Sequence, residues 1–214
     1  MTLYVPAHFA TDDRAAMARL MHDYPFATVI TPAGGELHVS HVPLLHVPDG
    51  EPHGTLVGHF ARANPHWLHA EGVESLVVFQ GPHAYVSPSW YTAPERMVPT
   101  WNYAAVHAHG TLAPVADDRQ ARGVLAALVE RFEGGRAAPW RPTMPAPQFD
   151  AMVSAIVAFR IPIRRLEGKF KLSQNRSAED RARVAQRLRG EGYAEAIATA
   201  EWMAQFAGAK RPPQ

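Results

Sequence analysis

Short apolar runs separated by turn residues make up most of the first half of the chain. Leu37–Val42 alternates apolar and polar residues, which is typical of a half-exposed strand. Ser75–Gln80 is almost continuously apolar, which is typical of a buried strand. Gly81-Pro82 is expected to break it, so that residues 83–86 form either the next strand or a bulged continuation of the same one. The pattern predicts strands over residues 26–31, 37–42, 55–60, 75–80, 83–86, 101–112 and 158–163.

Helical periodicity occurs at the start of the chain and again in its second half. Thr11, followed by Asp12 and Asp13, is a favourable helix start, because a hydroxyl caps free N–H groups and carboxylates face the positive helix end. Asn64 and Pro65 can begin a short helix in the same way. Further helices are expected over residues 117–133, 149–156, 177–189 and 193–206, with a frayed tail at 208–214.

The order of these elements favours a small antiparallel barrel over a sheet built from βαβ units. Six or seven short strands at hairpin spacing precede residue 112, and helices are inserted among them or follow them. The 214 residues, 47% of them hydrophobic, are enough for one substantial core but hardly for two full domains. We therefore predict an α+β protein, with a barrel domain over residues 1–170 and a basic helical extension of the same domain over 171–214.

The composition indicates the cellular compartment and excludes several kinds of metal and disulfide site. The chain has no cysteine, which excludes disulfides, zinc–thiolate sites and iron–sulfur clusters and suits a reducing cytoplasm. No basic and apolar leader begins the sequence, and no apolar run reaches the roughly 18 residues of a membrane span. The expectation is a soluble, cytoplasmic protein that binds no membrane.

Positive charge is concentrated in one segment. Residues 1–159 hold nine Lys/Arg and fourteen Asp/Glu, a balance of −5, whereas residues 160–189 hold ten Lys/Arg and three Asp/Glu, a balance of +7. Such asymmetry predicts a partner that carries phosphate. A cofactor phosphate and a nucleic-acid backbone both remain open at this point.

Three motifs have side chains suited to a bound cofactor. In the first, Arg62 and Asn64 lie where a strand end turns into a helix start, so a guanidinium and free N–H groups predict a phosphate site. The alternative is that Asn64 only caps the helix and Arg62 is a surface residue.

The second motif is rich in aromatic rings and hydrogen-bonding groups. It joins Gln80–Tyr91 to Val98–Tyr103, with prolines that fix the loop between them. A flat conjugated ligand needs apolar faces and polar edges, which such a loop provides. A packed barrel mouth, whose Trp and Tyr polar atoms find backbone partners, explains the same pattern equally well.

The third motif is Leu166–Arg176. Lys169 and Lys171 alternate around Phe170 in an extended stretch, so both lysines are expected on one side. Hydrogen-bonding side chains, Gln174 among them, follow before the next helix. The motif suits a phosphate or the polar edge of a cofactor, and a solvated basic connector is the alternative.

Classical catalytic and metal motifs are missing from the sequence. All twelve histidines precede residue 110, but neither HExxH nor HxxEH is present, so hydrogen-bonded or exposed histidines are expected rather than a metal site. Ser87 and Ser89 lack the Gly-x-Ser-x-Gly setting of a nucleophile, and no Walker or GxGxxG loop occurs. No residue stands out as a general acid or base, so no catalytic residue is predicted.

Three blocks of the sequence nevertheless resemble one known family. They are Tyr4–Phe9; the segments GHFARANPHW, FQGPHAYVSPSWY and VPTWNYAAVHAHG; and LEGKFKLSQNRSAEDR. In the same order and spacing, over about residues 1–190, the chain is similar to the PaiB-type FMN-binding negative transcriptional regulators. Members of this family resemble split β-barrels of the pyridoxamine-phosphate-oxidase and flavin-reductase kind, which form homodimers and bind FMN between subunits.

The resemblance implies FMN as the cofactor and a second copy of the chain as a partner. It implies that Arg62 and Asn64 lie near the FMN phosphate, and that Lys169, Lys171 and Gln174 join the same site. The residues that it implies around the flavin are Ser87, Ser89, Thr100, Trp101 and Asn102.

Three functions are then compatible with the sequence. The first is a PaiB-like negative transcriptional regulator, whose basic segment 160–189 binds DNA through a helix over 178–189. The second is a flavin-dependent oxidoreductase or flavin reductase acting on a small molecule, and the third is a haem-binding split barrel. No helix-turn-helix and no nicotinamide signature is evident, and function has to be argued from the site rather than from the fold.

Overall fold

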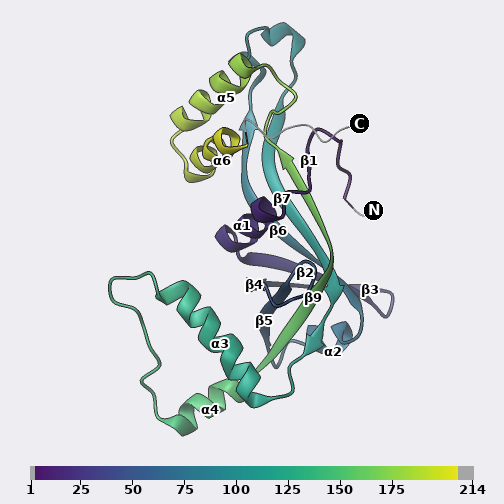
Figure 1. Ribbon diagram of the computed structural model, residues 1–214, viewed down its shortest axis with the longest axis vertical. Coiled ribbons are helices and arrows are strands. Elements are labelled where there is room, and N and C mark those ends of the chain that lie inside the picture. Colours follow the sequence, from purple (N-terminus) through teal and green to yellow (C-terminus); the bar gives the residue numbers. More distant parts are fainter. Residues whose placement is uncertain (1–2, 207–214) are drawn as a thin grey trace. The chain divides into compact units, whose positions relative to one another are not determined.

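The computed structural model describes residues 3–206 (Figure 1). The predicted frayed tail, residues 208–214, lies outside this range. The described strands are β1 (Ala10–Thr11), β2 (Phe26–Ala33), β3 (Glu36–Pro43), β4 (Leu45–Val47), β5 (Thr55–Ala61), β6 (Glu74–Val86), β7 (Thr100–Thr111), β8 (Ala113–Pro114) and β9 (Ile156–Lys171). The helices are α1 (Arg14–Asp23), α2 (His66–Ala70), α3 (Asp118–Glu133), α4 (Ala146–Ser154), α5 (Ala178–Gly190) and α6 (Ala194–Gln205), and two 3₁₀ turns are η1 (Pro88–Trp90) and η2 (Pro94–Arg96).

The strands form one sheet in the order β3-β2-β6-β7-β9-β5-β4, with the short β1 and β8 also pairing with β9. Neighbours β2–β3, β2–β6, β4–β5 and β5–β9 are antiparallel. The sheet and its added helices confirm the predicted α+β class. Within residues 3–206, no helix is both long and apolar enough to cross a membrane.

Most predicted elements are present, and the differences have local causes. Of the two possibilities after Gly81-Pro82, a separate strand is wrong, because β6 continues through both residues to Val86. A Cβ on Gly81 would lie 2.9 Å from Leu20 Cδ1 and 3.2 Å from Ala104 O, so glycine is what lets the strand pass close to its neighbours. β9 also extends eight residues beyond the predicted end at Ile163, to Lys171.

Capping side chains set the helix starts. Asp13, rather than the expected Thr11, caps α1: its Oδ1 accepts a hydrogen bond from Ala16 N at 3.0 Å. Asp117 begins α3 as predicted, accepting from Arg119 N and Gln120 N. The Oγ of Ser177 accepts from the Asp180 N–H, which begins α5.

The chain divides into two compact units. The first consists of the residues up to 20, residues 80–106 and those from 167 onward, and the second consists of 21–79 and 107–166. The strands β6, β7 and β9 contribute residues to both units. The predicted division into 1–170 and 171–214 stays a prediction.

Each unit has its own apolar core. In the second unit, the rings of Phe60 and Phe159 stack at 4.4 Å between centroids, and both side chains are buried. In the first unit, α5 and α6 lie side by side (Figure 1), and Phe170 from β9 packs its ring edgewise against Trp202 at 5.5 Å. Val184 and Leu188 of α5 are fully buried. These cores hold the strand ends and loops that carry the candidate site.

Candidate functional site

The predicted cofactor residues fall into both units. Arg62 and Asn64 belong to the second unit. The other eight belong to the first unit and are Ser87, Ser89, Thr100, Trp101, Asn102, Lys169, Lys171 and Gln174.

Arg62 and Asn64 are both engaged in local structure. The guanidinium of Arg62 donates from Nε to the Ser154 carbonyl at 2.6 Å and from Nη2 to the Ile156 carbonyl at 2.8 Å. Asn64 Oδ1 accepts from His66 N at 3.0 Å, and Nδ2 donates to Ser40 Oγ at 2.9 Å. Arg62 thus anchors the start of β9, and Asn64 caps the single turn of α2. These contacts are local structural ones, and the phosphate role of Arg62 and Asn64 stays a prediction.

Three cations of the first unit form a cluster without a carboxylate partner. They are Lys169, Lys171 and Arg176, and none of them makes an ion pair with a residue in the described range 3–206. Lys171 Nζ donates to Thr100 Oγ1 and, at 2.7 Å, to the Trp101 carbonyl. Lys169 Nζ donates to the Tyr4 carbonyl at 2.7 Å. We call Lys169, Lys171 and Arg176 the cation cluster.

Tyrosine rings make cation–π contacts with two of these three side chains. The ammonium of Lys169 lies 5.3 Å from the ring centroid of Tyr4 and 5.4 Å from that of Tyr103. The Arg176 guanidinium lies 5.4 Å from the Tyr91 centroid. A neutral tyrosine ring attracts a cation without neutralising it, so the cluster keeps its net positive charge and is suited to an anion.

Burial lowers the pKa of Lys171 below its ordinary value, and the positive charges of Lys169 and Arg176 lower the pKa further. Desolvation and like charge both disfavour the ammonium form. A bound anion would reverse the second effect. The electrostatics of the cation cluster therefore favour occupation by a negatively charged group.

An exposed aromatic surface lies next to Lys171 in the structure. The side chain of Trp101, whose carbonyl accepts from Lys171, is 52% exposed. Tyr85 approaches it edgewise at 6.1 Å between centroids, and His83 lies at 6.3 Å. An indole left open to solvent provides a flat apolar face for another ring.

The remaining polar residues that were predicted to contact the cofactor form hydrogen bonds mainly with other groups of the protein. Buried Asn102 donates to Ser173 Oγ at 2.9 Å and to Met203 Sδ at 3.3 Å. This contact holds Ser173, which has a φ of 66°, a conformation uncommon for residues other than glycine. Gln174 Oε1 accepts from Leu172 N and its Nε2 donates to the Phe170 carbonyl, both inside one turn. The hydroxyls of Ser87 and Ser89 bond to each other at 2.8 Å.

Two parts of this arrangement were missed by the sequence reasoning. Arg176 was counted in the basic segment but was not assigned to the site, and Tyr4 was noted only as part of a family block. The first carries charge in the cation cluster, and the second supplies a carbonyl and a ring to Lys169. Their presence in two of the three family-like blocks was the available signal.

His66 of the second unit is the centre of a small hydrogen-bonded network. Buried His66 bonds through Nδ1 to Ser40 Oγ at 2.8 Å and through Nε2 to Thr31 Oγ1 at 2.9 Å. His38 and His69 stack at 4.0 Å with their planes 7° apart. Among the described residues there is no group of three or more His, Asp or Glu side chains that could hold a metal ion.

Comparisons with known proteins identify the family. Residues 3–165 match the family model described as "Putative FMN-binding domain". The chain is 35% identical over 204 residues to Protease synthase and sporulation protein PAI 2 of Bacillus subtilis, in an alignment that covers 94% of this chain and 96% of that protein. Both findings confirm the resemblance seen in the three sequence blocks.

Solved structures of low sequence identity share the fold. The FAD and heme binding protein from Mycobacterium smegmatis has a TM-score of 0.60 at 21% identity, covering 81% of this chain and 78% of that one. The flavocytochrome Anf3 from Azotobacter vinelandii has a TM-score of 0.59 at 16% identity, covering 81% and 75%. These similarities confirm the predicted fold class.

Proposed function

The chain belongs to the family of FMN-binding domains, and we propose that it binds FMN and acts in the cytoplasm as a PaiB-like negative transcriptional regulator. The absence of cysteine is compatible with that reducing compartment. When bound, FMN supplies redox chemistry, while the protein supplies binding and orientation. The observation that carries the FMN part is the cation cluster beside the exposed indole of Trp101.

The chemistry of this site fits the two ends of FMN. The phosphate carries negative charge, and the cation cluster has three positive side chains without a carboxylate among the described residues. The isoalloxazine is a flat conjugated ring, and the Trp101 face is open to such a ring. We propose that Lys171 and Arg176 hold the phosphate, that Trp101 contacts the ring, and that the Ser87 and Ser89 hydroxyls meet polar edges. Lys169 adds to the positive electrostatic potential at this site.

Removing the Lys171 charge is expected to weaken FMN binding. Lys171→Gln should raise the Kd for FMN by roughly 10- to 100-fold, because a hydrogen bond to a charged group contributes about 1.5–3 kcal/mol. The measurement is a titration of flavin-free protein with FMN, with retention after desalting checked by flavin absorbance at about 450 nm. Arg122→Gln removes a cation paired with Asp150 on the surface of the second unit and is the control. Wild-type protein that retains no flavin would refute the proposal.

Self-association is proposed through one face of the sheet in the second unit. Registered pairs place Thr28 opposite His41, Ile30 opposite Val39 and Pro32 opposite Leu37, so these residues share a face. On β2 and β3 this face has no Lys, Arg, Asp or Glu, and Phe26, Leu37 and Val39 are 67%, 69% and 52% exposed. Glu74 of β6 lies at its edge and is paired with Arg164. An exposed apolar patch without charge can pack against its own copy about a two-fold axis without repulsion. The full set is Phe26, Thr28, Ile30, Pro32, Leu37, Val39, His41, Leu76 and Val78.

A charge at the centre of this face is expected to separate the subunits. Light scattering during gel filtration should give the mass of two chains for the wild type and of one chain for Val39→Lys. We expect the dimer Kd to rise by about 100-fold or more, because the lysine would be buried without a partner. Met152→Lys places the same charge on an exposed apolar residue of α4 and should remain dimeric. A monomeric wild type would contradict this assignment.

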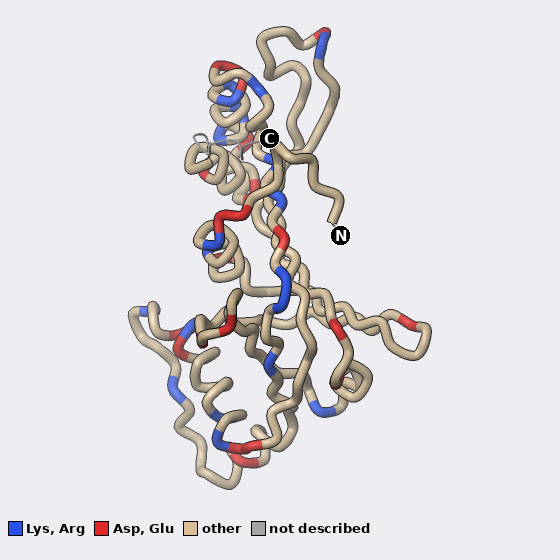
Figure 2. Tube along the Cα trace, turned by 45° about the vertical axis from the view of Figure 1, so that its right-hand side comes forward, with Lys and Arg blue, Asp and Glu red and all other residues tan. Residues whose placement is uncertain are grey.

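Binding to DNA is proposed through α5, because other cations of segment 160–189 are already engaged. Arg160 pairs with Asp49 at 2.5 Å and Arg164 pairs with Glu74 at 3.2 Å. Figure 2 shows basic residues along the tube where α5 lies. On that helix, Arg187 and Arg189 are exposed and have no ion-pair partner among residues 3–206. Positive side chains of this kind suit contacts to the phosphate backbone.

Loss of one such contact should change the salt dependence of DNA binding. For a 30-base-pair duplex (roughly three helical turns), Arg189→Gln is expected to reduce the slope of log K against log salt by about 0.9. Fluorescence anisotropy across a salt series measures it, with Arg119→Gln in α3 as the control. Selection from random duplexes then tests for a specific operator. No DNA binding, together with flavin reduction by a nicotinamide donor, would instead favour the oxidoreductase.

A further inference from the structure

A groove of about 580 Å³ in the first unit lies outside the residues assigned above to FMN. It lies between η1 and one face of α5, and its lining residues are Trp90, Arg183, Gln186, Arg187, Gly190 and Glu191. Residues 183, 186, 187 and 190 follow one another at helical spacing, so they share one helix face. The volume is within the usual range for a small-molecule site.

The two walls of the groove are tied together. Arg183 Nε donates to the Trp90 carbonyl at 3.0 Å. The buried carboxylate of Asp180 accepts from Thr92 N at 2.9 Å and from Thr92 Oγ1 at 3.0 Å. Hydrogen bonds from Thr92 accordingly lower the pKa of Asp180. These contacts hold the loop after η1 against α5, so the groove is formed before a ligand arrives.

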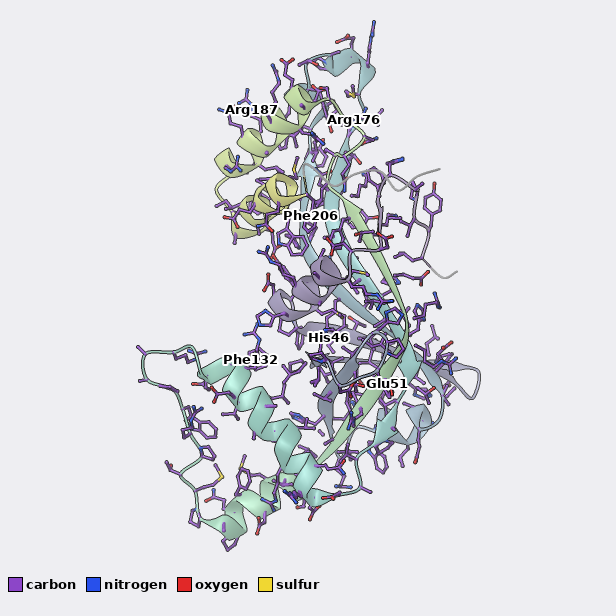
Figure 3. The ribbon with its side chains drawn as sticks, in the orientation of Figure 1. His46, Glu51, Phe132, Arg176, Arg187 and Phe206 are labelled. Carbon is purple, nitrogen blue, oxygen red and sulfur yellow. The ribbon has the colours of Figure 1, made fainter. Side chains whose placement is uncertain are left out.

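The lining groups define the ligand chemistry. Arg187, labelled on α5 in Figure 3, has an exposed side chain without a hydrogen-bonding or ion-pair partner among the described residues. Trp90 is half-buried and offers an indole face. Gly190 leaves open space, since a Cβ there would have no other atom within 4 Å. With Arg183 and Arg187 against Glu191, the lining has a net charge of +1, which matches a single negative charge.

We propose that this groove binds a small aromatic monocarboxylate. The carboxylate pairs with the Arg187 guanidinium, which suits it geometrically as well as electrostatically. The ring lies in the space above Gly190 against the Trp90 indole. Glu191 accepts a hydrogen bond from a donor at the opposite end of the ring. Trp90 directly follows Ser89 in the chain, so a ligand bound here would contact a residue next to one proposed to meet the flavin.

The probe is 4-hydroxybenzoate, which combines a ring, one carboxylate and a hydroxyl donor. Isothermal titration of the full chain should detect binding of this probe and little or none of 4-hydroxybenzyl alcohol, which lacks the charge. Phenyl phosphate, a dianion, should bind more weakly than 4-hydroxybenzoate. We expect Arg187→Gln to weaken binding by roughly 10-fold or more, which is the loss of one charge-assisted hydrogen bond.

A second variant tests the space rather than the charge. Gly190→Leu fills the groove in a helical conformation that leucine adopts readily, and it should abolish probe binding. Ala182→Leu adds the same bulk on α5 outside the groove and should leave binding unchanged. Circular dichroism establishes that both variants fold.

Titrations with and without FMN separate this proposal from the proposed function. Equal probe affinity in both states, with flavin retained, supports a distinct site. Release of FMN by the probe would assign the groove to the flavin and overturn the inference, as would absence of binding or equal binding by the Gly190→Leu variant. A chain that binds the probe but no FMN would refute the proposed function and leave this inference standing.

Discussion

Replacing Gly110 with alanine is expected to destabilise the second unit by about 3 kcal/mol or more. Gly110 lies in β7, where a Cβ would lie 2.2 Å from the Pro162 carbonyl oxygen and 2.7 Å from Ile161 Cγ2. Both atoms belong to β9, and a backbone carbonyl cannot rotate away as a flexible side chain can. The strands would have to separate, and apolar packing around them would be lost.

Urea denaturation followed by circular dichroism measures this effect. Gly123→Ala is the matched control, because Gly123 lies inside α3 with no other atom within 4 Å of its Cβ position. That substitution should stabilise the protein by up to about 1 kcal/mol through helix propensity. A Gly110→Ala variant as stable as the wild type would show that β7 and β9 are less closely packed than described.

Acid is expected to destabilise the protein through His66. Burial, followed by the charges of His38 and His69, lowers the pKa of His66 from 6.5 to about 4. Above pH 6.5 the imidazole is neutral in both the folded and the unfolded chain, so it contributes no pH dependence. As the pH falls from 6.5 toward 4, the unfolded chain takes up a proton that the folded chain does not, and stability is lost.

The expected loss from this one group is about 2 kcal/mol between pH 7.5 and pH 5. His66→Gln removes the titrating group, so the difference in unfolding free energy between the two pH values should shrink by that amount. His66→Gln also loses hydrogen bonds to Ser40 and Thr31, which lowers stability at both pH values and cancels in the comparison. Urea denaturation at pH 7.5 and 5 provides the four free energies.

Exposed His22 is the control for this prediction. His22→Gln retains His66 and should therefore retain the loss of stability that His66 causes. If His66→Gln lost stability with falling pH as steeply as the wild type, another group would have to be responsible. His59 is the next candidate, since burial also lowers its pKa.

The proposed cofactor site and the groove on α5 use different cations of the same basic segment. Lys171 and Arg176 precede α5 and face tyrosines or the β7 backbone, whereas Arg183 and Arg187 line the groove. A net charge of +7 over residues 160–189 therefore does not describe one continuous surface. The tests above address Lys171 by flavin retention, Arg187 by probe binding and Arg189 by salt dependence.

The sequence by itself determined the elements, because their signals are local. Alternation in Leu37–Val42, the capping group Asp117 and the Ser177 helix start act within a few residues, and β3, α3 and α5 begin within a residue or two of their predicted positions. Three ordered sequence blocks were enough to identify the family and to predict the fold class. The family match over residues 3–165 covers these blocks up to the start of the third.

Only the tertiary structure decided which partners surround each polar side chain. Arg62 and Lys171 looked equivalent as candidate cations in the sequence. Arg62 bonds to carbonyls 92 and 94 residues away, whereas Lys171 bonds to Thr100 and to the Trp101 carbonyl and lies near two further cations, Lys169 and Arg176. The groove likewise needs Trp90 and Arg183, 93 residues apart, to meet. Partners this distant depend on how whole segments pack and pair, which the local period and propensity of a sequence do not encode.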